Sequence, residues 1–308
     1  MKSLFSIRKE TIVWLILLFI TTSAYSQQGL SYTQYIDNQT PVNPTFSLMN
    51  PYGTLNTLVR KQWVGVPGAP TTYLIDGSVP IASINGSAGF VAENDVLAVE
   101  NLSELNVFFA KGIRLSETQN LAVSISAGFR NYVANYSQLD ASDPVFANNI
   151  NETKPNLGFG IMYYTPSYYV GVSAPDLTFR SLGTASVENN TNFESYYYFS
   201  AGASTKLGED YEFKYATLEA YAKNVPLLAN VSALFYLKNI IGFGVNYRSN
   251  NEVAGMLSID YNILHIGYAY EFAATPSTIG GYSNATHEIT LGIRFGKGSR
   301  VGEEDPAH

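Results

Sequence analysis

Apolar or aromatic residues alternate with small or polar residues along much of the chain. The clearest run has Leu121, Val123, Ile125 and Phe129 at alternate positions, with small or polar residues between them. The same alternation recurs in 157–164, 241–248, 264–272 and 288–295. A period of two places all the apolar side chains on one face of a β-strand. The pattern therefore predicts an all-β chain.

About fourteen such strands can be placed along the sequence. They are expected near 54–63, 71–79, 86–93, 104–114, 120–132, 156–165, 168–174, 195–207, 211–222, 228–238, 240–248, 253–262, 263–272 and 286–295. Several are longer than the usual strand of a soluble protein and reach the length that a tilted strand needs to cross a bilayer.

The connections between these segments alternate between short and long from the sixth strand onward. Short ones are expected at 165–167, 208–210, 238–239 and 262–263, and long polar ones at 133–155, 175–194 and 273–285. Outer-membrane barrels have short periplasmic turns at one end and longer loops at the other. The sequence therefore predicts an antiparallel transmembrane β-barrel of the outer-membrane type, with both termini in the periplasm.

Composition supports this interpretation. Charged residues make up 14% of the chain, against about 25% in an ordinary soluble domain. A soluble β-sandwich, the alternative all-β fold, would carry many Lys and Glu side chains on its polar faces. The net charge of −7 and the lack of basic runs argue against nucleic-acid binding. Because the chain has no cysteine, a disulfide framework and thiolate chemistry are excluded.

The chain begins like an exported protein. Three basic residues precede an unbroken apolar run, Ile12 to Ile20, and small or polar residues follow up to Ser26. This order is typical of a cleavable signal peptide, and the run is much shorter than the ~20 residues of a spanning helix. We expect a signal peptide at 1–26, a segment at 27–53 that either plugs the barrel or lies in the periplasm, a barrel at 54–295 and a polar periplasmic tail at 296–308.

The sequence offers little sign of catalysis. The mature chain has three histidines, and His265 and His287 fall on neighbouring predicted strands without the spacing of a zinc site or a catalytic triad. His287 and Glu288 are adjacent in a strand, so they face opposite sides. We therefore predict no catalytic residue, no metal site and no cofactor. An outer-membrane enzyme remains an alternative. In that case His265→Ala or His287→Ala would abolish hydrolysis.

One block of sequence is distinctive. It consists of Arg60, Lys61, Gln62, Trp63 and Gly65, followed by Gly68 and Pro70. With this block and later landmarks such as 143–146, 155–160, 245–249, 267–270 and 286–289, the chain resembles the PorP/SprF family, outer-membrane proteins of the type IX secretion and gliding systems of Bacteroidetes. The block is expected to shape the first hairpin.

The resemblance implies a non-enzymatic barrel that acts in export or surface attachment of a large adhesin and docks the adhesin's C-terminal domain. It also implies contacts with other periplasmic components of the type IX system and supplies no catalytic residue. The long loops are the expected contact surfaces, with these candidate residues: Asp143, Phe146, Asp176, Phe179 and Tyr282. The main rival is a transport channel for small or hydrophobic compounds.

Overall fold

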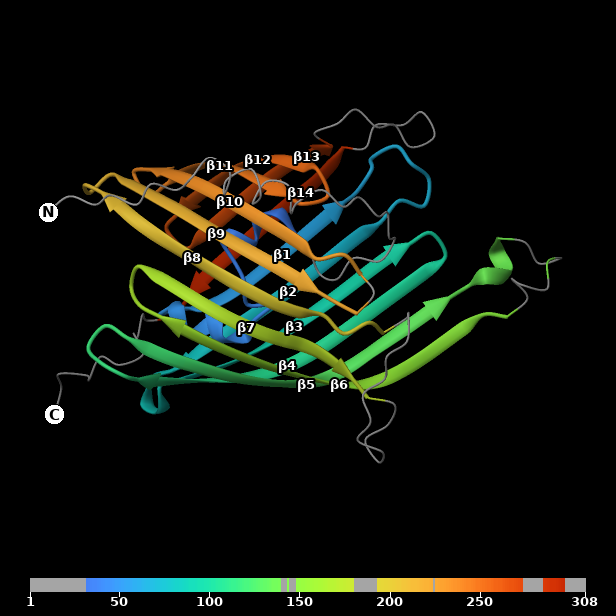
Figure 1. Cartoon of the computed structure of the whole chain (residues 1–308), viewed down its shortest axis with the longest axis horizontal. Helices are drawn as coiled ribbons and strands as arrows, with labels where there is room; N and C mark the ends of the chain where they lie inside the picture. Colours follow the sequence, from blue (N-terminus) through green and yellow to red (C-terminus); the bar gives the residue numbers. More distant parts are fainter. Residues whose placement is uncertain are drawn as a thin grey trace, which may run out of the picture.

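The chain forms a closed barrel of fourteen antiparallel strands in which β1 pairs with β14 (Figure 1). The computed structural model describes residues 32–139, 143, 148–179, 193–223, 225–273 and 285–296. The strands are β1 Gly53–Lys61, β2 Thr71–Ile81, β3 Gly86–Leu97, β4 Glu100–Arg114, β5 Asn120–Ala134, β6 Ile150–Tyr164, β7 Tyr168–Thr178, β8 Tyr197–Leu207, β9 Tyr211–Tyr221, β10 Leu228–Leu237, β11 Ile241–Arg248, β12 Glu252–Tyr261, β13 Leu264–Ala273 and β14 Thr286–Phe295. The predicted fold class is confirmed.

Four short 3-10 helices accompany the strands in the described part of the chain. Two precede the barrel, η1 Thr33–Ile36 and η2 Pro44–Met49, and two lie in connections, η3 Ala82–Ile84 and η4 Tyr136–Gln138. Within the described residues, none of the helices is long and apolar enough to cross a membrane.

The two faces of the barrel wall differ as the alternation predicts. Val107, Phe129 and Val245 point outward, and each is 59% exposed although it is a large apolar residue. Their neighbours in the strands point inward, and many are small or polar, such as the buried Asn106 and Asn246, although the buried Phe108 is apolar. An apolar exterior around a polar interior is the arrangement of a barrel that faces lipid.

The wall is taller on one side than on the other. Strands β4, β5 and β6 each have 15 residues, whereas β8 to β14 have between 8 and 11. Figure 1 shows β5 and β6 extending past the other strands at one end of the barrel. We call this end, which carries the connections at 135–149 and 179–196, the long-loop end. The opposite short-turn end holds the start of β1 and the end of β14.

The tall side continues beyond the apolar band. Its outward residues change from apolar to polar on one rung, where Ser103 pairs with Asn131 and Asn131 pairs with Thr153. The Asn131 amide donates to Thr153 Oγ1 at 2.8 Å and to Asn151 Oδ1 at 3.1 Å. The expectation that 150–155 belongs to a loop is therefore wrong, because these polar residues continue the β5–β6 ladder and bond to one another across it.

Charge placed on the outer face gives a direct test of the membrane band. Val107→Arg puts a guanidinium in the apolar band and should destabilise the barrel by about 2–4 kcal/mol, whereas Asn151→Arg, above that band, should cost about 0–1 kcal/mol. Urea unfolding of the barrel in phospholipid vesicles measures both. Equal costs for the two variants would contradict this placement of the band.

Candidate functional site

The segment between Tyr32 and Asn50 lies inside the ring of strands. Its helix η1 contacts β9, β10, β12, β13 and β14, and its helix η2 contacts β2 to β6 on the other side of the barrel. Tyr35, Val42 and Thr45 are fully buried there. Proline at the first position of η2 and the Asn43 side chain, which accepts from Thr45 N at 3.2 Å, define the start of this helix. We call residues 32–50 the lumenal segment.

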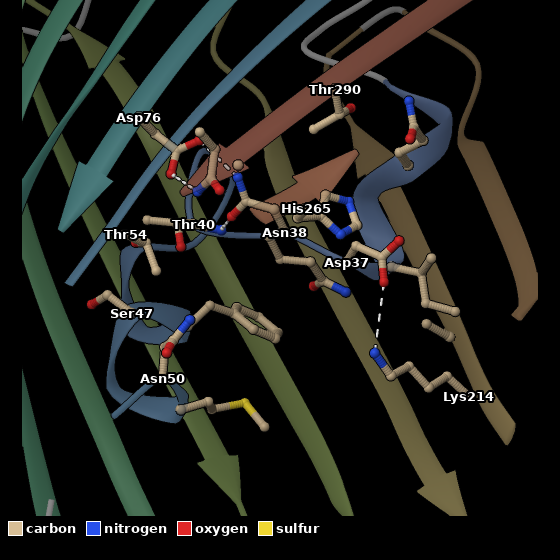
Figure 2. Close-up of a pocket in the computed structure, with 18 of the residues that line it drawn as sticks. Asp37, Asn38, Thr40, Ser47, Asn50, Thr54, Asp76, Lys214, His265 and Thr290 are labelled. Atoms are coloured by element: carbon tan, nitrogen blue, oxygen red, sulfur yellow. Dashed lines mark hydrogen bonds and ion pairs between the residues drawn. The ribbon is translucent and has the colours of Figure 1, made fainter. Parts of the chain in front are cut away.

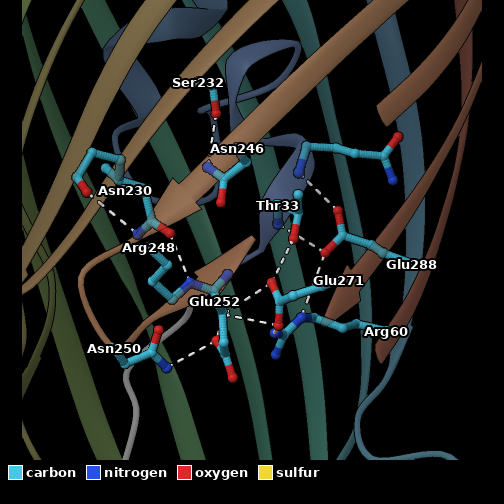
Figure 3. A network of polar contacts seen from close by, with 12 residues as sticks. Thr33, Arg60, Asn230, Ser232, Asn246, Arg248, Asn250, Glu252, Glu271 and Glu288 are labelled. Atoms are coloured by element: carbon cyan, nitrogen blue, oxygen red, sulfur yellow. Dashed lines mark hydrogen bonds and ion pairs between the residues drawn. The ribbon is translucent and has the colours of Figure 1, made fainter. Parts of the chain in front are cut away.

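A group of charged side chains holds the start of the lumenal segment near the long-loop end (Figure 3). Glu288 of β14 accepts the backbone N–H groups of Thr33 at 2.9 Å and Gln34 at 2.8 Å. Glu271 of β13 accepts the Thr33 hydroxyl at 3.0 Å. Two carboxylates from neighbouring strands thus bind consecutive residues of the segment.

Arginines from β1 and β11 balance these carboxylates. Arg60 lies 2.7 Å from Glu271 and 3.6 Å from Glu288, and Arg248 lies 3.2 Å from Glu271 and 2.9 Å from Glu252. We call these five residues the clamp. Burying charges is costly unless they are paired and hydrogen-bonded, so removing one partner would leave the others uncompensated.

Further contacts fix the middle of the lumenal segment. The buried Tyr35 hydroxyl donates to the backbone oxygens of Ala216 at 2.9 Å and Asn230 at 3.1 Å. Burial raises the pKa of Tyr35, which keeps this hydroxyl protonated as a donor. Asn38 donates to Asp76 at 2.7 Å, and the Ser173 hydroxyl donates to Val42 O at 2.6 Å. The segment is therefore bound to strands all around the barrel.

A cavity of about 460 Å³ lies between the lumenal segment and the wall toward the short-turn end (Figure 2). Asp37 and Lys214, 3.7 Å apart, stand on one side of it, and Pro166 and Arg294 mark its position near the short turns. Among the described residues, buried polar atoms of Gln34, Gln39, His265 and Thr290 border this cavity without a hydrogen-bond partner. We call this space the vestibule.

The distinctive block of sequence forms the end of β1 and the loop to β2. Arg60 points into the barrel as part of the clamp, and Lys61 is exposed on the opposite face. Hydrogen bonds tie the loop to both neighbouring hairpins: Val64 N donates to Ala285 O before β14, and Ala98 N between β3 and β4 donates to Gly68 O, each at 2.9 Å.

Three residues of this loop have positive φ angles, which favour glycine: Trp63 at 43°, Gly65 at 101° and Gly68 at 73°. Gln62 N donates to Pro70 O at 3.0 Å and closes the loop. A Cβ at Gly68 would lie 3.2 Å from the Cβ of Ala98, so the close approach of the two hairpins also needs glycine there.

The candidate contact residues fall in different places. Phe146 and Tyr282 lie outside the described residues, and Asp143 lies in the connection between β5 and β6. The expectation that Asp176 belongs to a loop is wrong. It lies in β7, and its carboxylate accepts from Asn156 at 2.8 Å and Asn106 at 3.3 Å inside the barrel. Phe179 follows β7 directly and donates its N–H to Pro155 O at 3.0 Å.

The two histidines of the strands do not meet. His265 points into the vestibule and lies 3.1 Å from Asp260, whereas His287 bonds to the hydroxyl of the outward-facing Tyr268 at 2.8 Å. The described residues contain no group of three or more His, Cys, Asp or Glu side chains that could hold a metal ion.

Sequence reasoning missed the clamp, although Arg60 belongs to the distinctive block of sequence. Glu271, Glu288 and Arg248 are inward charges near the same end of three strands. Their inward positions at similar distances from the long-loop end are visible in the alternation of each strand. That signal could have grouped the three residues, but it does not show that the carboxylates contact Thr33.

Comparison with solved structures finds outer-membrane barrels. The chain is similar to Omp33 of Acinetobacter baumannii, with 8% identity, coverage of 80% of this chain and 100% of that chain, and a TM-score of 0.48. It is also similar to the toluene transporter TbuX of Ralstonia pickettii, with 10% identity, coverage of 86% and 94%, and a TM-score of 0.50. The toluene transporter TodX of Pseudomonas putida matches with 9% identity, coverage of 84% and 94%, and a TM-score of 0.48. At these identities the likeness shows the fold alone. Curated protein sequences give no significant match.

Comparison with protein families gives a match over residues 24–293 to the family described as type IX secretion system membrane protein PorP/SprF. The match covers nearly the whole chain, including the distinctive block and the clamp. With the barrel fold, it also places the protein in the outer membrane. The chain belongs to the PorP/SprF family of type IX secretion system membrane proteins.

Proposed function

We propose that the barrel is a non-enzymatic receptor that acts in export and surface attachment of a partner adhesin, whose C-terminal domain it docks at the long-loop end. The observation that carries the proposal is the binding of the lumenal segment across the interior, with the clamp beneath the long loops. A filled interior favours recognition at the rim over conduction through the barrel.

The shape of the rim supports the same proposal. The tall side, β4 to β6, rises past the apolar band with outward amide and hydroxyl groups of Ser103, Asn131 and Thr153. Such a wall offers hydrogen-bonding groups to a folded domain above the lipid. With long loops at the cell surface, the short-turn end faces the periplasm, where other components of the secretion system would meet it.

Loss of the protein should release one large adhesin. Deleting the gene is expected to move that adhesin from the cell surface to the medium, and the full chain should restore its attachment. The loop between β7 and β8 can then be tested by replacing 181–191 with a short Gly-Ser linker, which spares β7 and the buried Phe193. We expect at least a tenfold loss of retained adhesin, because removing one cluster of interface contacts typically weakens binding by about this much or more.

Quantitative comparison of surface and medium proteins measures both changes, with the same linker placed in the connection at 249–251 as the control. Unchanged surface proteins in the gene deletion would overturn the proposed function. An unchanged adhesin in the 181–191 variant alone would remove only this loop from the contact surface.

A transport channel is the second candidate, and the vestibule favours it. The cavity of about 460 Å³ is large enough for a small solute, and the polar atoms of Gln34, Gln39 and Thr290 at its border could bind one. Under this alternative the lumenal segment is a plug that must move. The strength of the contacts between the clamp and the segment would then set how readily the segment moves.

Weakening the contact between Glu288 and the lumenal segment should loosen the segment. The chain has no native cysteine, so Val42→Cys introduces a single buried thiol in the segment. Adding Glu288→Gln removes charge-assisted hydrogen bonds worth about 1.5–3 kcal/mol, so labelling of Cys by a soluble maleimide should accelerate about 10- to 100-fold. Glu252→Gln is the matched control, since Glu252 contacts Arg248 but not the segment.

The same variants in planar bilayers separate the two candidates. Conductance that appears with Glu288→Gln would show that the segment closes a pore, and selective solute uptake by the native chain would favour the channel. Equal acceleration of labelling by Glu252→Gln would contradict the specific role of Glu288.

A further inference from the structure

The seam between β7 and β8 is shorter than the strands that form it. Its pairing runs from Tyr168 with Ala203 to Ser173 with Tyr198 and then ends. On its other side β7 stays paired with β6 as far as Thr178. Within the described part of the chain, β7 therefore continues through 174–178 with no strand paired to its β8 side.

The chain leading into β8 leaves the wall at this point. Phe193 is fully buried against Tyr132 of β5, with ring centroids 6.3 Å apart. The guanidinium of Arg130, also on β5, lies 5.9 Å from the Phe193 ring and donates to Glu194 O at 3.2 Å. Residues 193–196 thus turn inward over the interior instead of extending the seam.

The sequence of β7 suits an interrupted seam. Pro175 has no N–H to give to a neighbouring strand, and proline is found in sheets mainly at edges and bulges. A bulge in the β6–β7 pairing falls between Leu157 and Phe159, opposite Pro175 and Asp176. Bulges also occur preferentially at barrel rims and beside functional sites.

An apolar recess of about 460 Å³ opens on the outer surface at this seam. Its lining comes from β6 to β9 and the residue before β10, and includes Phe159, Ile161, Val172, Ala174, Phe199 and Leu227. Tyr197 and Tyr221, at the long-loop ends of β8 and β9, border it with ring centroids 6.4 Å apart. Aromatic side chains at strand ends mark the membrane interface, so the recess lies near the outer surface of the membrane.

One carboxylate stands in this apolar wall. Leu218 and Ala220 are buried in the interior, so Glu219 between them points outward into the recess. The backbone of Glu219 is paired with Phe199 and Ala229, but among the described residues its carboxylate has no hydrogen-bond or ion-pair partner. Outward charges in a barrel are costly near lipid, and this one would gain from an N–H donor or a cation.

We propose that the β7–β8 seam binds an extended strand of a protein partner beside β7. In this mode main-chain hydrogen bonds give affinity, and pockets for alternate side chains give specificity. Apolar side chains of the strand would enter the recess, and a Lys, an Arg or a main-chain N–H would meet Glu219. Resting on the proposed function, the partner is the C-terminal domain of the adhesin.

The charge of the recess favours a peptide over a lipid. An acyl chain could fill the apolar part, but it offers nothing to the open edge of β7. An anionic headgroup would be repelled by Glu219. A strand with alternating apolar and basic side chains matches both features.

Cross-linking from a single cysteine tests the proposal. Ala174→Cys places a thiol in the recess. Val253→Cys is the control, because Val253 lies on the outer face of β12 and is paired with Tyr247 on one side and Phe272 on the other. A maleimide-benzophenone probe on intact cells should capture the adhesin's C-terminal domain with Ala174→Cys and not with Val253→Cys. Capture of lipid alone, or of a different protein, would overturn the proposal.

Glu219→Gln supplies a second measurement in the otherwise native chain. Loss of the charge should lower adhesin retention about tenfold, whereas Glu212→Gln on the inward face of the same strand should leave it unchanged. Equal retention in both variants would overturn the role of Glu219. If gene deletion itself leaves the adhesin attached, the proposed function fails. If deletion releases the adhesin but neither seam measurement changes, only the seam proposal fails.

Discussion

The need to pair every backbone polar group inside hydrocarbon governs this structure. Lipid offers no hydrogen bonds, so strands can cross it only in a closed ring. Closure is achieved where β1 pairs with β14 over nine residues, from Gly53 with Phe295 to Lys61 with His287. Once the ring is closed, each strand has one face toward lipid and one toward the interior, and the outward apolar residues need no protein partner.

Closure also decides what the interior must do. Inward side chains include many polar ones and an apolar cluster that contains Leu58, Leu74 and Leu218. A barrel of this size leaves space that strands alone do not fill. The lumenal segment fills much of it and brings main-chain N–H groups to Glu288. Arg60 and Arg248 let Glu271 and Glu288 be buried as pairs, so the clamp stabilises the segment and the charged wall together.

The sequence could predict those features that depend on neighbouring residues. Alternation predicted the strands and the two faces of each strand. It could not predict which inward residues meet, because Arg60 and Glu271 are 211 positions apart and touch only through the register of a closed ring. It also placed Asp176 and 150–155 in loops, since polar residues that bond across a tall hairpin look the same in sequence as a solvated connection.

The β7–β8 seam is the place where the governing constraint is relaxed. An open strand edge is unstable in hydrocarbon but tolerable near the membrane surface, where water or a partner can pair with it. The bulge opposite Pro175 and the inward turn at Phe193 both lie at the level where the β7–β8 pairing ends. The local sequence therefore accounts for the interruption, and the ring of strands stays closed below it. A barrel whose interior is largely filled can still bind a partner in a defined orientation if that partner pairs with the edge of β7 at this seam.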